Sequence, residues 1–187
     1  MKSSSQIAEQ VIHLSRAASA AGAAEELTAA QWAALRFAAS ANRLSATPGD
    51  FARFHGVTKG AASQILTGLT RRGLLEVRAA QSDGRRRLIS LTLAGRAALA
   101  RDPAARLGAA IAALAPAERA ALASGLTALS RQLAAPPCQI AIFGLCEDCA
   151  HRGPGAPPAC LAHDPAYPAS DRDGFCGDFM PAGRVAT

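Results

Sequence analysis

The sequence predicts a mainly α-helical fold of the α+β class, in which one short β-hairpin interrupts a series of helices. Half of the 187 residues are hydrophobic but only 4% are aromatic, and much of the hydrophobic share is alanine. This composition favours helices packed on helices over a sandwich of strands. Apolar residues recur at helical spacing along most of the chain, and the spacing changes to that of strands only around residues 74–92.

The charge of the chain is divided into a basic body and an acidic tail. Residues 1–135 carry 17 Lys/Arg against 8 Asp/Glu, whereas residues 136–187 carry 3 against 6. The net charge of +6 and the pI of about 9.6 indicate a polyanion as a partner. We therefore expect two parts, a basic body over residues 1–135 and a separate acidic tail over residues 136–187.

Two helices are expected at the start of the body. The first covers residues 5–21, where one face carries Ile7, Val11 and Leu14. The second begins at residue 28, because Thr28-x-x-Gln31 is a capping-box pattern. One buried face of this second helix is expected to carry Trp32, Leu35 and Ala39.

Two more helices are expected before the hairpin. The run Thr47-Pro48-Gly49-Asp50 combines a capping hydroxyl, a proline at the first helical position and an acid near the positive end. That helix ends at Gly56. Thr58 can cap the next helix, residues 59–72, which ends at Gly73. Its apolar positions form a single stripe, and the opposite face is polar.

The segments LLEVRAA and RRLISLT, residues 74–80 and 86–92, are expected to be strands. An Asp-Gly turn signal lies between them, so they predict a β-hairpin with a basic loop. Thr92 is expected to cap a further helix that breaks near Asp102-Pro103. Leucines then recur at helical spacing as far as residue 133, with an interruption at Pro116.

Helix, short turn, helix and an arginine-tipped hairpin together predict a winged helix-turn-helix. The major groove of DNA accommodates one α-helix, whose exposed side chains then meet base edges. We therefore expect double-stranded DNA as the partner, contacted by Lys59, Ser63, Gln64, Thr67 and Arg71. The loop arginines are expected to reach the minor groove or its phosphates, namely Arg85, Arg86 and Arg87.

The runs LTAAQWAAL, GVTKGAASQILTGLTRRGLLEVR and SDGRRRLISLTLAGRAAL resemble the MarR family of bacterial regulators over roughly residues 25–100. The resemblance implies a homodimer built from the N- and C-terminal helices, which binds a pseudo-palindromic operator. It also implies that Arg85 is the wing-tip arginine and that Asp83 positions it. Gly60 and Ala61 depart from the bulkier or polar residues common there in the family, which reduces the expected base contacts.

The leucine stripe over residues 107–133 has two interpretations, a core within one chain or a seam between two chains. Because the body has few large side chains of its own, the seam is favoured. The stripe therefore agrees with a homodimer.

All five cysteines lie in the last 50 residues, where proline and glycine are dense: Cys138, Cys146, Cys149, Cys160 and Cys176. Such a segment cannot bury enough apolar surface to offset the entropy of ordering it. A metal bound by several thiolates would supply the missing free energy. The close pair Cys146-x-x-Cys149 suits two ligands of one centre, which Cys160 and Cys176 complete. Cys138 is left over, either as a spare thiol near the helix end or as an alternative ligand. The nearby histidines, His151 and His163, are expected to be ordinary loop residues.

The ligand types alone leave the metal open, because zinc and an iron–sulfur cluster both accept four thiolates. Zinc sites commonly have two close cysteine pairs, and only one pair is close here. The Cys-x-x-Cys pair, a later cysteine and the run DGFCGDF are together similar to the ligand run of high-potential iron–sulfur proteins, over residues 146–179. This resemblance implies a 4Fe–4S cluster on Cys146, Cys149, Cys160 and Cys176. Zinc is the alternative, and redox thiols without a metal are a third interpretation.

The tail also holds four of the eight aromatic residues, Phe143, Tyr167, Phe175 and Phe179. They are expected either to shield a cluster from water or to form a small core of the tail. The tail follows the last leucine of the stripe directly. Changes in its centre are therefore expected to act through the dimerisation helices.

We expect a transcription regulator whose operator binding is modulated by this centre. No nucleophile–base pair, phosphate loop or flavin motif is visible, so an enzyme is not expected. Two alternatives are a small-molecule-responsive regulator with a structural zinc, and a redox or electron-transfer module fused to a DNA-binding domain. No secretory signal or membrane span is visible, so we expect a cytoplasmic protein without a membrane partner.

Overall fold

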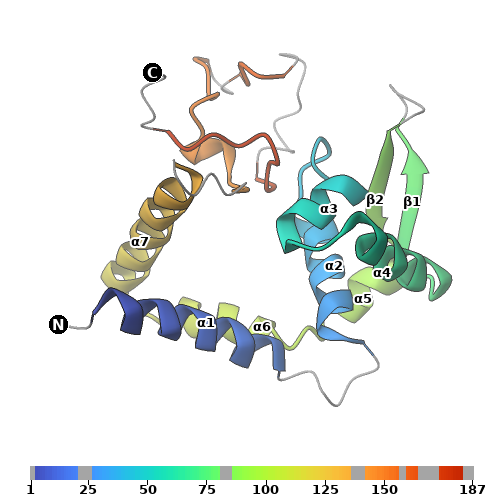
Figure 1. Cartoon of the computed structure of the whole chain (residues 1–187), viewed down its shortest axis with the longest axis horizontal. Coiled ribbons are helices and arrows are strands. Elements are labelled where there is room, and N and C mark those ends of the chain that lie inside the picture. The colour runs from blue at the N-terminus through green and yellow to red at the C-terminus, as the bar shows by residue number, and fades with distance from the viewer. Residues whose placement is uncertain are drawn as a thin grey trace.

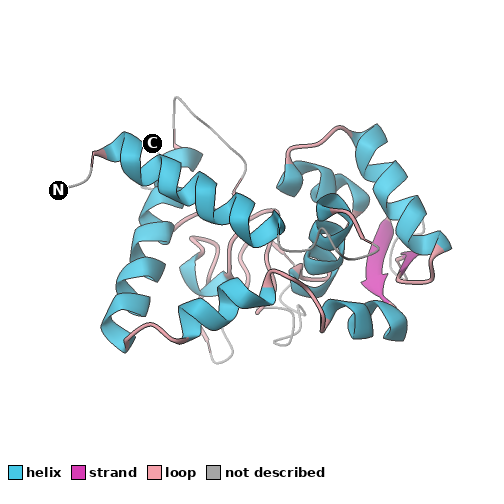
Figure 2. Cartoon of the chain, turned by 90° about the horizontal axis from the view of Figure 1, so that it is seen from below, coloured by secondary structure: helices cyan, strands magenta, loops and turns pink. Residues whose placement is uncertain are grey.

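The computed structural model describes residues 3–20, 27–80, 86–135, 142–155, 159–163 and 173–182. A winged-helix lobe, residues 27–99, lies on one side. Helices α1 (Ser4–Ala20), α6 (Ala105–Ala112) and α7 (Pro116–Ala134) lie on the other (Figures 1 and 2). The tail lies between the end of α7 and the lobe (Figure 1).

The first two helices of the lobe begin at the predicted caps. Helix α2 spans Ala29–Ser40, and both bonds of the Thr28–Gln31 capping box are present, at 3.3 and 3.0 Å. Helix α3 spans Pro48–His55, where Thr47 Oγ1 accepts the Asp50 N–H at 3.0 Å.

Helix α4 spans Lys59–Arg71 and is capped by Thr58, as predicted. The turn that joins α3 to α4 is made at Gly56, whose φ of 61° is left-handed and favours a residue without a Cβ atom. This turn lets α4 pack against α3 and α2. The helix-turn-helix predicted from the sequence is therefore confirmed.

The predicted hairpin is present as two antiparallel strands, β1 at Leu75–Ala79 and β2 at Arg87–Leu91. Leu75 lies opposite Leu91, and Ala79 lies opposite Arg87. Helix α5, Leu93–Leu99, follows at once and is capped by Thr92 as predicted. The two strands form the wing of the lobe.

Helix α2 lies at the centre of the lobe, in contact with α3, α4, α5 and β2. Its buried residues surround most of its circumference, namely Trp32, Ala33, Ala34, Leu35 and Phe37. The prediction that Ala39 shares the buried face is wrong, because Ala39 is exposed and Phe37 is buried instead. A helix packed on several sides does not follow a single apolar stripe.

The predicted break near Asp102 is confirmed, and an ion pair holds it. The Asp102 carboxylate is buried and accepts two bonds from Arg36 Nη1 of α2, at 2.9 and 3.1 Å. It also accepts the Ala104 N–H at 2.9 Å. This carboxylate therefore connects the lobe to the segment that leads into α6.

Helices α1 at Ser4–Ala20, α6 at Ala105–Ala112 and α7 at Pro116–Ala134 contain no buried residue whose side chain the structure describes. Large apolar side chains are exposed on all three, among them Ile7, Val11, Leu14, Leu107, Leu122, Leu126 and Leu129. The leucine stripe is therefore uncovered in the single chain and does not form an intramolecular core. Within the described ranges, no helix combines the length and the apolar character needed to cross a bilayer.

The tail packs on the winged-helix lobe and extends its core. Phe143 lies 5.0 Å from the ring centroid of Phe54 and 6.3 Å from that of Phe37. Phe175 lies 6.0 Å from Phe54, also between ring centroids. Two of the four tail aromatics thus pack on the lobe, and Tyr167 lies outside the described residues.

Candidate DNA-binding face and cysteine centre

Helix α4 presents the polar face that the sequence predicted. The buried stripe of Ala62, Leu66 and Leu69 fixes the rotation of the helix against the core. The side chains predicted to contact DNA are all exposed, namely Lys59, Ser63, Gln64, Thr67 and Arg71. The face therefore presents hydrogen-bonding groups and two cations to the solvent.

The arginines of the wing have more varied surroundings. Asp83 and Arg85 lie outside the described residues, so the interpretation of the wing tip stays a prediction. Arg86 is half-buried, and its Nη2 donates to the Leu44 carbonyl. Arg87 is exposed, and Arg78 lies 2.5 Å from the Glu76 carboxylate. Part of the positive charge of the wing is therefore engaged within the lobe.

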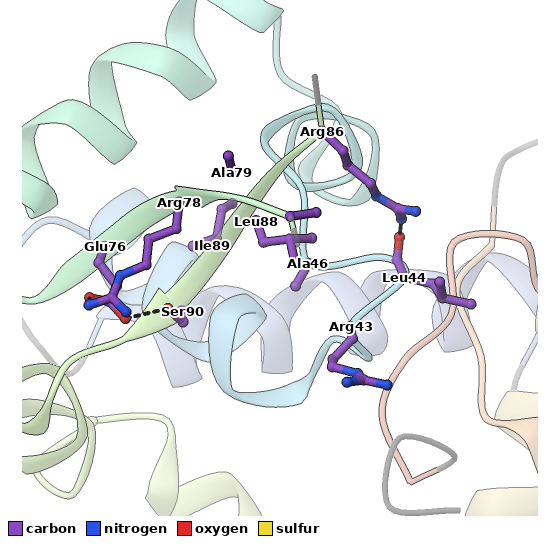
Figure 3. A pocket seen from close by; sticks show the side chains of 11 residues that line it. Arg43, Leu44, Ala46, Glu76, Arg78, Ala79, Arg86, Leu88, Ile89 and Ser90 are labelled. Carbon is purple, nitrogen blue, oxygen red and sulfur yellow. Dashed lines mark hydrogen bonds and ion pairs between the residues drawn. The ribbon is translucent and has the colours of Figure 1, made fainter. Parts of the chain in front are cut away.

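An open groove of about 630 Å³ lies along the wing, against the loop that follows α2 (Figure 3). Arginines from three places line it, namely Arg43, Arg78 and Arg86. Its apolar wall includes Ala79 and Leu88. Glu76 also lines the groove and pairs with Arg78, and Arg86 donates to the Leu44 carbonyl, so the positive charge of the groove is partly engaged.

Backbone pairs bring the cysteines of the tail to one segment, residues 144–152. Cys146 and Cys149 flank a 3₁₀ turn within this segment. Cys160 pairs with Arg152, and Cys176 pairs with Gly144, through isolated antiparallel bridges. The four cysteines predicted as ligands are thus held around one short stretch of chain. Cys138 lies outside the described residues.

None of these four cysteines forms a disulfide with another described residue. In the described ranges, no three His, Cys, Asp or Glu side chains converge closely enough to hold a single metal ion. Four thiolates on one zinc would lie about 3.8 Å apart, from a Zn–S distance of about 2.3 Å in a tetrahedron. The described side chains thus do not form a closed zinc site.

Cys176 is the buried member of the set, and polar groups of the lobe surround its sulfur. Burial raises the pKa of the Cys176 thiol, while the side chains of Asn42 and Ser45 oppose this shift through hydrogen bonds. The Oδ1 atom of Asn42 accepts the Ser45 N–H at 2.8 Å, which fixes its amide. The Nδ2 atom of Asn42 is buried, and no atom in the described part of the chain accepts a hydrogen bond from it within the usual distance. A buried donor beside a thiol fits a site for a sulfur-ligated centre.

The histidines of the tail do not join the cysteines. His163 Nε2 lies 3.3 Å from the Asp178 carboxylate, and His151 accepts the Leu161 N–H with its backbone carbonyl. Neither histidine belongs to a group of three metal-ligating side chains among the described residues.

Three residues that contact the tail were not singled out from the sequence as site residues, namely Asn42, Ser45 and Arg53. Asn42 and Ser45 follow α2 in a loop, where such residues are commonly turn formers. The Nη2 atom of Arg53, on α3, donates to the Gly177 carbonyl at 2.7 Å.

Residues 26–86 match the family model of the MarR family. These residues include α2, α3, α4 and β1 of the winged-helix lobe. No curated protein sequence matches the chain.

Solved structures share the fold. The S. aureus MepR–DNA complex covers 71% of this chain and 99% of that chain, at 20% identity and a TM-score of 0.53. A MarR family transcription regulator covers 67% and 84%, at 24% identity and a TM-score of 0.51. Bordetella bronchiseptica BpsR, whose DNA binding is regulated by 6-hydroxynicotinic acid, covers 69% and 94%, at 23% identity and a TM-score of 0.50.

Proposed function

We propose that the chain is a homodimeric DNA-binding transcription regulator that inserts α4 into the major groove. The observation that carries this proposal is the exposed polar face of α4, opposite a buried stripe. That arrangement leaves Ser63, Gln64 and Thr67 for base edges and Lys59 and Arg71 for phosphates. The MepR structure with the same fold is a DNA complex, which supports the same mode of binding.

The exposed apolar faces of α1, α6 and α7 support a dimer. Leu122, Leu126 and Leu129 are 39%, 47% and 45% exposed in the single chain. A second copy of the chain would cover them, and two-fold symmetry would then present two α4 helices to a pseudo-palindromic site. Arg85 and Asp83 remain the proposed wing-tip contacts.

Binding to duplexes selected from a random-sequence pool tests this function. We expect affinity to fall steeply with salt concentration, because bound phosphates release counterions. Gln64→Ala would relax sequence preference, whereas Arg71→Ala would weaken all duplexes and reduce the salt slope by about one. Arg101→Ala, an exposed arginine near the α5–α6 break, is the control. Absence of any salt-dependent duplex binding contradicts the function.

We further propose that Cys146, Cys149, Cys160 and Cys176 hold a 4Fe–4S cluster that modulates DNA binding. Support comes from the grouping of the four cysteines around residues 144–152 and from the buried Asn42 donor beside Cys176. When bound, such a cluster supplies a reversible one-electron centre whose loss is sensitive to oxidants. The four cysteines would ligate it, and the buried Nδ2 donor of Asn42 would lie beside the sulfur of Cys176.

Anaerobic purification with iron, sulfide and zinc analysis tests this second proposal. A broad absorption band near 400 nm with about four iron and four sulfide per chain supports the cluster. One zinc per chain without sulfide contradicts it and favours the structural zinc alternative. Cys176→Ser is expected to abolish loading. Cys138→Ser, which removes a thiol outside the proposed ligand set, is the matched control and should load as the wild type does.

A small anionic effector is a second candidate for regulation, favoured by the groove along the wing. Arg43, Arg78 and Arg86 line that groove beside Leu88 (Figure 3). BpsR, with the same fold, responds to an aromatic acid. Titration with hydroxylated aromatic acids, followed by duplex affinity and by Arg43→Ala, would separate this candidate from the cluster.

A further inference from the structure

Two buried polar side chains of the loop between α2 and α3 face the tail. Asn42 is 3% exposed and Ser45 is 1% exposed. Ser45 Oγ accepts the Gly177 N–H at 2.6 Å, and the Asn42 side chain interacts with the Cys176 sulfur. Burying a polar group is unfavourable unless it is paired, so the buried Ser45 hydroxyl is stabilised by its hydrogen bond with the tail.

The backbone of the same tail segment is paired with the end of α2. Phe175 N–H donates to the Ser40 carbonyl at 2.6 Å, and Asn42 N–H donates to the Phe175 carbonyl at 3.0 Å. The approach is close, because a Cβ atom at Gly174 would lie 2.7 Å from Asn42 N. One at Gly177 would lie 2.7 Å from Arg53 Nη2. The segment 174–177 is therefore shaped to dock on this loop.

Contact with the tail continues into α3. Arg53 of α3 donates to the Gly177 carbonyl at 2.7 Å and lies with its Cζ atom 5.2 Å from the ring centroid of Phe143. Helix α3 packs directly on α4, the helix proposed to enter DNA. A change in the position of Gly177 therefore reaches α4 through one intervening helix.

We propose that Ser45 and Arg53 couple the state of the cysteine centre to the recognition helix. This inference rests on the proposed function. Ligation of Cys176 fixes residues 174–177, and Ser45 and Arg53 then hold α3 in the position described here. Loss of the centre releases Cys176, and a tail rich in proline and glycine does not stay ordered by itself. The signal thus enters the lobe at the α2–α3 loop, in addition to any route through α7.

The test compares full-length wild type, Ser45→Ala and the matched control Ser40→Ala. The Ser40 hydroxyl donates to the Arg36 carbonyl of its own helix, at 2.7 Å, and so makes a bond that does not involve the tail. Each protein is purified anaerobically, analysed for iron, sulfide and zinc, and measured before and after removal of its metal. The two readouts are affinity for a selected duplex and hydrogen exchange of the α3 amides.

For the wild type and Ser40→Ala, we expect removal of the centre to change duplex affinity by roughly tenfold or more and to raise α3 exchange. The metal content of Ser45→Ala is measured first, because the Ser45 side chain also hydrogen-bonds the Cys176 thiol. Removal of the centre from Ser45→Ala should change its duplex affinity by less than about threefold. The α3 amides of this variant should exchange fast even while the centre is bound. Wild-type behaviour of Ser45→Ala in both readouts overturns the proposal.

Other outcomes remain decisive. If Ser45→Ala does not fold or load, Arg53→Met gives the same test from the α3 side, and a wild-type response of that variant overturns the proposal. Equal duplex affinity of loaded and stripped wild type, with equal α3 exchange, overturns the coupling but leaves DNA binding intact. If no duplex binds at all, the proposed function fails, while α3 exchange still decides whether Ser45 links the tail to α3.

Discussion

The Nη2 atom of Arg53 donates a hydrogen bond of 2.7 Å to the backbone carbonyl of Gly177, so a helix of the lobe holds the tail directly. The same guanidinium lies 3.2 Å from the Asp50 carboxylate and stacks on the ring of Phe143. One side chain thereby combines a charge-assisted hydrogen bond and a cation–π contact with the tail and an ion pair within its own helix.

Arg53→Met is expected to lower the free energy of unfolding by about 1–2 kcal/mol, because it removes one charge-assisted bond and one cation–π contact. The arginine is 47% exposed, which keeps the effect near the lower end. Chemical denaturation followed by circular dichroism measures it. Arg101→Met, whose guanidinium bonds only weakly to its own helix at 3.4 Å, should change little. Equal effects of the two variants would show that the contact between Arg53 and the tail does not contribute to the free energy of unfolding.

The ion pair between Arg36 and Asp102 gives a second prediction. Arg36→Ala leaves a buried carboxylate without its cation and should destabilise the lobe by about 2–3 kcal/mol. The double variant Arg36→Ala/Asp102→Ala should be less destabilised than the sum of the two single variants. A double-mutant cycle by urea denaturation measures this coupling, which we expect to be about 1–2 kcal/mol. Strict additivity would mean that the pair is not coupled in solution.

The uncovered leucines predict the behaviour of the dimer. Leu126→Glu places a charge on the exposed apolar face of α7, where a partner chain would have to bury it. We expect the variant to be monomeric in sedimentation experiments at concentrations where the wild type is dimeric, and to bind a two-half-site duplex much more weakly. Leu93→Glu is the control, because Leu93 is 86% exposed on α5. If Leu126→Glu is still dimeric, the dimer interface does not include this face of α7.

Local features of this fold could be predicted from the sequence because neighbouring residues determine them. The cap at Thr58 depends on the amide of Ala61, three positions later. The exposed face of α4 follows from one apolar stripe in a helix buried on one side. The same reasoning is wrong at Ala39, because α2 is packed on several sides and its apolar residues do not follow a single stripe.

Contacts between distant residues could not be predicted in this way. Ser45 and Gly177 are 132 positions apart, and nothing in the residues near either one indicates the other. The aromatic residues of the tail were expected to serve the tail itself, yet Phe143 and Phe175 pack on Phe54 of the lobe. Cysteine spacing indicates a ligand set, but it does not distinguish a cluster from zinc, because both accept thiolates.

His55 gives the last prediction, on the dependence of stability on pH. Its ring lies 4.9 Å from that of Phe51 and 5.1 Å from that of Phe54, between centroids. Burial lowers the pKa of His55 below its usual value of 6.5, and the nearby charge of Arg36 lowers it further. A hydrogen bond to the Ala33 carbonyl opposes this shift only in part.

Because the folded pKa of His55 lies below the unfolded value, the unfolded chain binds a proton first as the pH falls. The free energy of unfolding should therefore decrease as the pH falls through 6.5 towards the folded pKa, and this contribution should be complete below that value. His55→Gln keeps an N–H donor but does not titrate. Urea denaturation at about pH 7.5 and 5.5 should show a smaller loss of stability for this variant than for the wild type. An identical loss in both proteins would assign the pH dependence to other groups, since only His55 differs between them.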